Sequence, residues 1–190
     1  RPDGREWIHP ARPSDEFLVE LEGLAPGATV VLSGDTGWRL VSAGRSTGRG
    51  WKLLEVRLAS RQHPVEVRRT WAVHATLPVV RQWTTVVNTG DAALRLRRID
   101  SFRLRLAPTP EDLELSWLNN YCRGLKPSPS HPVHRRTVGV NVRHHVETGP
   151  YSPDCAWFTL EVPGTAAGIT GGWEWSGPVK VGFGDWDGPC

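Results

Sequence analysis

Apolar and polar side chains alternate along most of this chain, the pattern of strands with one buried face. The clearest run holds Val65, Val67, Trp71 and Val73 on one parity, with charged residues and Thr between them. Alternating, β-branched or aromatic runs predict further strands at 28–33, 38–42, 51–59, 79–87, 94–106, 113–117, 138–142, 158–162 and 166–175. Apolar residues do not recur at helical spacing, so we expect an all-β fold. It would be an antiparallel β-sandwich of about ten or more strands with little helix.

The connections are predicted from turn residues. Asn88-Thr89-Gly90-Asp91 suits a tight turn, which makes 79–98 a predicted hairpin. The apolar parity shifts at Ile99, so we expect a β-bulge at 98–100. Residues 42–50 suggest a flexible loop, the Pro-rich 126–132 a surface loop, and 1–14 an irregular lead-in.

Composition fits this picture, with 20 Gly and 16 Pro among 190 residues for turns and ten Trp for a bulky interior. We expect one sandwich domain over 1–190. The sequence contains no Met, so we expect it to be a piece of a longer chain.

Charge and cysteine content narrow the function classes. The net charge is +3, with basic residues balanced by 20 acidic ones along the chain, so we expect no nucleic-acid partner. No apolar run has the length of a membrane span, and no signal-peptide pattern begins the sequence. We therefore favour a cytoplasmic location, with a signal peptide lost upstream as the alternative.

The three cysteines, Cys122, Cys155 and Cys190, lack the spacing of metal ligands. A disulfide bridge between Cys122 and Cys155 is an alternative that the sequence leaves open.

Classical catalytic motifs are weak here. Asp185 and Asp187 would point to one side of a strand, as a glycosidase pair could, but solvated turn residues are the simpler interpretation. His131, His134, His144 and His145 lack acidic neighbours at a fixed offset, and no Gly-x-Ser-x-Gly motif occurs. We therefore predict no catalytic residue, metal or cofactor. The alternating Arg95, Arg97, Arg103 and Arg105 suggest a solvated or domain-facing sheet surface.

The candidate binding site is Trp173-Glu174-Trp175, which follows Gly171-Gly172. Flat indole faces stack on sugar C–H surfaces and a carboxylate binds hydroxyls, so these three residues are a candidate carbohydrate contact. The alternation places both Trp on one face, which is also how a core-facing strand looks.

Two stretches resemble the amino-terminal β-supersandwich domain of the α-galactosidase (melibiase) enzymes of glycoside hydrolase family thirty-six. The first runs from Val65 through Pro78-Val79-Val80-Arg81-Gln82-Trp83 and the Asn88 turn to Asp100-Ser101-Phe102. The second joins Ala156-Trp157-Phe158-Thr159-Leu160 to Gly172-Trp173-Glu174-Trp175-Ser176-Gly177. Together they cover roughly residues 50–177.

The resemblance implies a galactose-mutarotase-like supersandwich in a retaining glycosidase. The catalytic Asp residues would lie in a (β/α)₈ barrel that follows in the same chain. This fragment would then do no chemistry, and would brace the barrel, help the enzyme to form a homo-oligomer and edge its sugar pocket. The alternatives are a stand-alone carbohydrate-binding module and a structural or oligomerisation domain.

Overall fold

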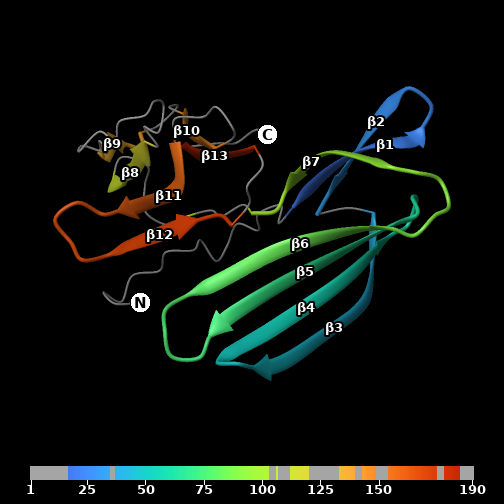
Figure 1. The fold of residues 1–190 in the computed structure, drawn as a ribbon, viewed down its shortest axis with the longest axis horizontal. Helices are drawn as coiled ribbons and strands as arrows, with labels where there is room; N and C mark the ends of the chain where they lie inside the picture. Colours follow the sequence, from blue (N-terminus) through green and yellow to red (C-terminus); the bar gives the residue numbers. More distant parts are fainter. Residues whose placement is uncertain are drawn as a thin grey trace, which may run out of the picture. The chain divides into compact units, whose positions relative to one another are not determined.

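The computed structural model describes residues 17–34, 37–102, 106, 112–119, 133–139, 143–148, 154–174 and 178–184. These residues form thirteen strands, all paired antiparallel where they pair, and the described part of the chain holds no α-helix (Figure 1). The all-β antiparallel prediction is confirmed. The lead-in 1–14 and the Pro-rich segment 126–132 lie outside the described residues.

The strands gather in two compact units, each with its own core. The amino-terminal unit is 10–105, and the carboxyl-terminal unit is 106–190 together with 1–9. That 1–190 forms one domain stays a prediction.

The amino-terminal unit contains two sheets. Its three-stranded sheet has the order β2-β1-β7, and its four-stranded sheet the order β3-β4-β5-β6 (Figure 1). The bounds are β1 Leu18–Ala25, β2 Ala28–Ser33, β3 Trp38–Gly48, β4 Trp51–Ser60, β5 Val65–His74, β6 Val80–Asn88 and β7 Arg95–Asp100.

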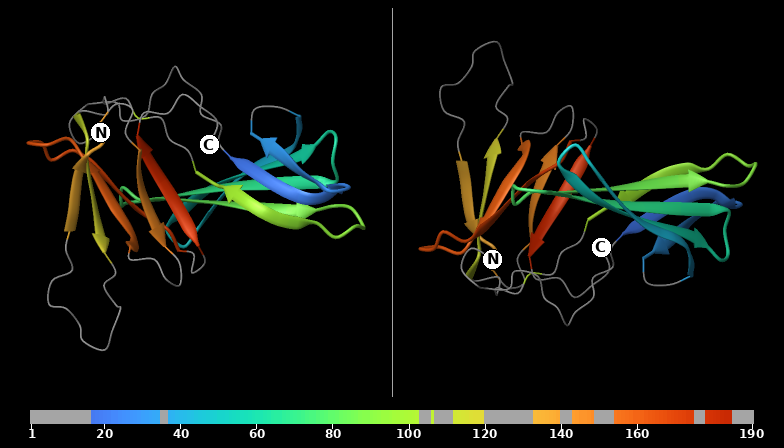
Figure 2. Two further views of the ribbon diagram at one scale, coloured as in Figure 1. Left: turned by 90° about the horizontal axis from the view of Figure 1, so that it is seen from above. Right: turned by 90° about the horizontal axis from the view of Figure 1, so that it is seen from below.

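The two sheets of this unit share one apolar core. Val19 and Leu21 of β1 are buried against Val65 and Val67 of β5, with Phe17 beside them. In Figure 2 the blue β1 lies along the green strands, as this packing requires. Each such buried aliphatic side chain contributes roughly 1.5–3 kcal/mol. The alternation around Val65 therefore marks the inner face of a sandwich.

Arg69 is buried in this inner face. Its guanidinium lies 5.2 Å from the Trp71 ring and 5.7 Å from the Phe17 ring. Its Nη1 donates to the Ser101 carbonyl at 2.7 Å and to Thr84 Oγ1. The charge is thereby placed between aromatic faces and oxygens, and the segment after β7 is held to the four-stranded sheet.

The flexible loop predicted at 42–50 is wrong. Strand β3 continues to Gly48, which pairs with Trp51 across a two-residue turn. Both turn residues have positive φ, 50° at Arg49 and 80° at Gly50, as a type I′ hairpin turn demands. Backbone pairing with β4 orders the small and polar residues there, although they lack an apolar pattern.

The predicted hairpin over 79–98 is also wrong. β6 pairs with β5, whereas β7 pairs with β1 in the other sheet. The turn itself forms, because Asn88 Oδ1 accepts from the Gly90 N–H and Asn88 Nδ2 donates to the Ala92 carbonyl. The chain crosses between sheets after it. The predicted bulge exists one residue early, since Glu20 and Leu21 pair with Arg98 and Leu96 and leave one extra residue between them.

The carboxyl-terminal unit contains a four-stranded sheet, order β12-β11-β8-β9, and the pair β10-β13. Their bounds are β8 Glu114–Asn119, β9 Val133–Thr137, β10 Arg143–Thr148, β11 Asp154–Glu161, β12 Gly168–Gly172 and β13 Val179–Gly184. The strands predicted at 113–117 and 158–162 are confirmed as β8 and β11.

The core of this unit joins both sheets. Leu115 and Leu160 come from the larger sheet, and Val146 and Phe183 from the pair. Phe158 meets Phe183 edge to face, with ring centroids 4.8 Å apart.

Candidate functional site

Of the predicted sugar-contact residues, Trp173 packs on the core of the carboxyl-terminal unit. It is partly buried there, and its Nε1 donates to Thr148 Oγ1 at 2.7 Å. Glu174 is exposed, and Trp175 lies outside the described residues. The packing and hydrogen bond of Trp173 fit the core-facing interpretation, and a sugar contact by these three residues stays a prediction.

The glycines before Trp173 are required by close packing. A Cβ on Gly171 would lie 2.3 Å from Phe158 Cζ, and one on Gly172 would lie 2.5 Å from the Ala156 carbonyl oxygen. The Phe158 ring therefore lies directly over Gly171, its cross-strand partner. The Gly-Gly-Trp sequence is therefore a packing motif. Because the two glycines lack a Cβ, an aromatic ring can pack against one of them and a backbone carbonyl against the other.

The predicted histidines that the structure describes do not converge on one point. His134 stacks on Trp117 with ring centroids 5.0 Å apart, and His144 Nε2 lies 3.1 Å from the Thr137 carbonyl. His145 is exposed on β10, and His131 lies outside the described residues. Within the described ranges, no three His, Cys, Asp or Glu side chains group so as to hold a metal ion.

The structure describes only some of the other predicted positions. Asp185, Asp187, Cys122 and Cys190 lie outside the described residues, and Cys155 is half-buried on β11. Where the structure describes the chain, no helix is long and apolar enough to cross a membrane.

The predicted arginine row is a charged sheet surface where it is described. Arg95 Nη1 lies 4.0 Å and Arg97 Nε 3.2 Å from the carboxylate of Glu22, and both arginines are exposed. Arg103 and Arg105 lie outside the described residues.

The outer face of the four-stranded sheet, on the side opposite the core, is a surface that the sequence analysis did not predict as a site. The register assigns the same side to alternate residues of the three adjacent strands β4, β5 and β6. The members of this outer face are Trp51, Leu53, Glu55, Arg57 and Ala59; Glu66, Arg68, Thr70, Ala72 and His74; Arg81, Trp83, Thr85 and Val87.

An ion cluster lies at one end of the outer face, where β4 ends and β5 begins. Arg57 Nε and Nη2 each donate to the carboxylate of Glu66 at 3.0 Å, and Arg68 Nε donates at 2.8 Å. Glu66 is 7% exposed. Hydrogen bonds from Arg57 and Arg68 lower its pKa from 4.5 to about 2. The carboxylate thus holds together two arginines that face each other across β4 and β5.

Three aromatic rings lie on the same face, Trp83 in the row next to the cluster and Trp51 with His74 at the opposite end. Trp51 meets the His74 ring edge to face at 4.9 Å, and the Arg81 guanidinium lies 5.8 Å from the Trp51 ring. His74 Nδ1 accepts from the Leu77 N–H at 3.1 Å, which fixes the ring in the turn after β5. Trp83 is 43% exposed. The outer face therefore presents a solvent-exposed indole near charged side chains that are held in place. The alternation of residues around Trp83 in the sequence could have indicated that Trp83 lies on this face.

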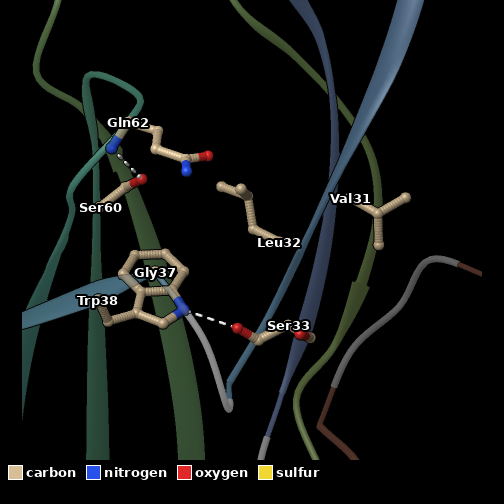
Figure 3. A pocket seen from close by; sticks show the side chains of 7 residues that line it. All are labelled: Val31, Leu32, Ser33, Gly37, Trp38, Ser60 and Gln62. Carbon is tan, nitrogen blue, oxygen red and sulfur yellow. Dashed lines mark hydrogen bonds between the residues drawn. The ribbon is translucent and has the colours of Figure 1, made fainter.

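A pocket of about 170 Å³ lies elsewhere in the amino-terminal unit (Figure 3). Its lining residues are Val31, Leu32, Ser33, Gly37, Trp38, Ser60 and Gln62. Trp38 Nε1 donates to the Ser33 carbonyl at 2.6 Å, and Ser60 Oγ accepts from the Gln62 N–H at 3.3 Å. Much of its polar lining is thus used within the chain.

Comparison with solved structures shows a likeness to the GH36 α-galactosidase AgaB from Geobacillus stearothermophilus. The TM-score is 0.58 at 16% sequence identity, over 81% of this chain and 21% of that chain. No known family model matches the chain, and no curated protein matches it. At this identity the likeness concerns the fold. The chain therefore has an all-β fold that resembles part of a GH36 α-galactosidase.

Proposed function

We propose that the chain is the non-catalytic amino-terminal sandwich of a glycoside hydrolase that removes terminal α-galactosides. The observation that carries this is the match of most of the chain to about a fifth of AgaB, described as an α-galactosidase. The catalytic Asp residues would lie in a (β/α)₈ barrel of the same longer protein, which the sandwich would brace.

Four acidic side chains of the described residues support a non-catalytic role. Glycosidases need two carboxyl groups roughly 5–10 Å apart across a bound sugar. Here Glu22, Glu66, Asp100 and Glu147 are all engaged with Arg or Lys side chains. These ion pairs direct the four carboxylates to neighbouring cations within the protein rather than to a bound substrate.

The test compares the longer protein that contains this sequence with the 190-residue chain, using p-nitrophenyl α-galactoside. We expect the longer protein to hydrolyse it with retention of configuration, and the chain alone to be inactive. The proposal fails if the isolated chain is active. It also fails if the downstream coding sequence lacks a barrel-length α/β segment with acidic residues at its strand ends.

An oligomerisation role is the second candidate, because an apolar row is exposed on the four-stranded sheet. Val73 and Val80 are cross-strand partners, 46% and 64% exposed, and Leu54 is 37% exposed. If this row joins copies of the protein, Val80→Lys lowers the molar mass measured by light scattering. An unchanged mass in Val80→Lys removes this candidate.

A further inference from the structure

We propose that the outer face around Trp83 binds a neutral pyranose sugar, with the ring on the indole and the hydroxyls on the charged groups beside it. The site belongs to this chain itself. The inference stands whether or not the longer protein hydrolyses α-galactosides.

Trp83 supplies the apolar surface. Its indole is 43% exposed, and it lies opposite Thr70, which is buried. An exposed indole offers apolar surface on which the C–H groups of a sugar ring can pack. No ring contact or hydrogen bond joins the Trp83 side chain to any described residue.

The hydrogen-bond donors are held in place beforehand. Arg68 lies diagonal to Trp83 in the register, a spacing of roughly 7–8 Å between backbones, within reach of both side chains. Arg57 and Arg68 are fixed by the buried carboxylate of Glu66. Their bonds to Glu66 leave Arg57 Nη1 and both Nη atoms of Arg68 without a partner among the described residues. Fixed donors lose little freedom on binding, which favours affinity.

An acceptor completes the set. Glu55 is exposed on the same face and lies opposite Thr70, on the side away from Trp83. Strands are roughly 4.8 Å apart, so Trp83 and Glu55 are separated by about the length of a disaccharide. Sugar hydroxyls both donate and accept, and this face offers both kinds of partner.

The local charge favours a neutral ligand. Counted together with Glu55, which lies two residues from Arg57 on the same face, the charges of Arg57, Arg68 and Glu66 sum to zero. The further arginine of this face, Arg81, lies over the Trp51 ring. An amphiphilic, uncharged, hydroxyl-rich ring fits better than a phosphate or an acidic peptide.

The test follows the indole and arginine N–H signals of the 190-residue chain by NMR during titration with methyl α-D-galactopyranoside and with raffinose. We expect saturable shifts of the Trp83 indole and Arg68 Nε–H signals, while the Trp173 indole signal stays in place. Trp83→Ala and Arg68→Gln should each weaken binding about tenfold, because each removes one face of the site. Amide spectra report whether each variant is folded, and Trp83→Phe serves as the milder replacement.

Matched controls are Phe102→Ala, which removes another exposed aromatic ring, and Arg45→Gln, which removes a charge on β3 from the inner side of the sheet. Both should bind as the parent chain does. The proposal is overturned if neither sugar shifts the Trp83 signal, or if binding survives Trp83→Ala unchanged. It is likewise overturned if inorganic sulfate binds at Arg57 and Arg68 and displaces the sugar. Inactivity of the longer protein on α-galactosides leaves these results untouched, so the two proposals fail separately.

Discussion

The indole nitrogen of Trp173 donates a hydrogen bond to the Thr148 hydroxyl over 2.7 Å. The bond links the end of β12 to the last residue of β10, which lies in the other sheet of the carboxyl-terminal unit. A tryptophan that looks available for sugar is therefore part of the packing. Exposed indole surface is found instead at Trp83 of the amino-terminal unit.

Thr148→Val should destabilise the chain by about 1 kcal/mol, since the partly buried indole N–H loses its acceptor while the side-chain shape is kept. Trp173→Phe removes the donor, and the double variant should show that the two losses overlap. Urea unfolding measures all three. Thr170→Val, at an exposed position on β12, is the control and should be neutral. Fully additive losses would contradict the pairing.

Gly171→Ala should destabilise the chain by about 1–3 kcal/mol, because the new methyl group overlaps the Phe158 ring, which cannot move within a packed core. Thermal unfolding is the measurement. Gly44→Ala is the matched control, since a Cβ there meets nothing within 4 Å and Gly44 has no positive φ. A Gly171→Ala protein as stable as the parent would show that the ring does not lie over the glycine.

Glu66 should make stability depend on acid pH. Its pKa is about 2 in the folded chain, against an ordinary value of 4.5. Between these two pH values the native state therefore binds fewer protons than the unfolded state. The contribution is complete above pH 4.5 and is lost as pH falls towards 2. Glu66→Gln should lower the urea midpoint at pH 7 and flatten the pH dependence below 4.5.

The control for Glu66 is Glu161→Gln, an exposed glutamate on β11, which should keep both the midpoint and the parent's acid profile. If Glu66→Gln retained the full loss of stability between pH 4.5 and 2, another carboxyl group would be responsible.

Arg49→Asn should stabilise the chain by about 0.5–1 kcal/mol. Arg49 has a φ of 50°, a strained value for a long side chain, and Asn-Gly is the preferred pair for a type I′ turn. Differential scanning calorimetry should show a higher melting temperature. Arg45→Asn, within the strand before the turn, should show no such gain.

The sequence by itself determined the strands that carry their own pattern. Alternation at Val65–Val73 and at Phe158–Val162 predicted β5 and β11, because a strand that is buried on one side has an apolar residue at every second position. Turn residues predicted the Asn88 turn, and the shift of parity at Ile99 predicted a bulge in the following strand; both depend on a few neighbouring residues. The all-β class follows from these local signals together.

Only the tertiary structure decided which strands pair and which tryptophans are open. β6 and β7 are joined by a good turn, yet they lie in different sheets, because strand partners are chosen by burial on a shared core. The stretch 42–48 is a strand because β4 pairs with its backbone. Trp173 and Trp83 both stand in alternating stretches of the sequence. Alternation in the sequence shows on which side of a strand a residue lies, but not what packs against that side. The packed indole of Trp173 and the exposed indole of Trp83 therefore become different only when the sheets assemble.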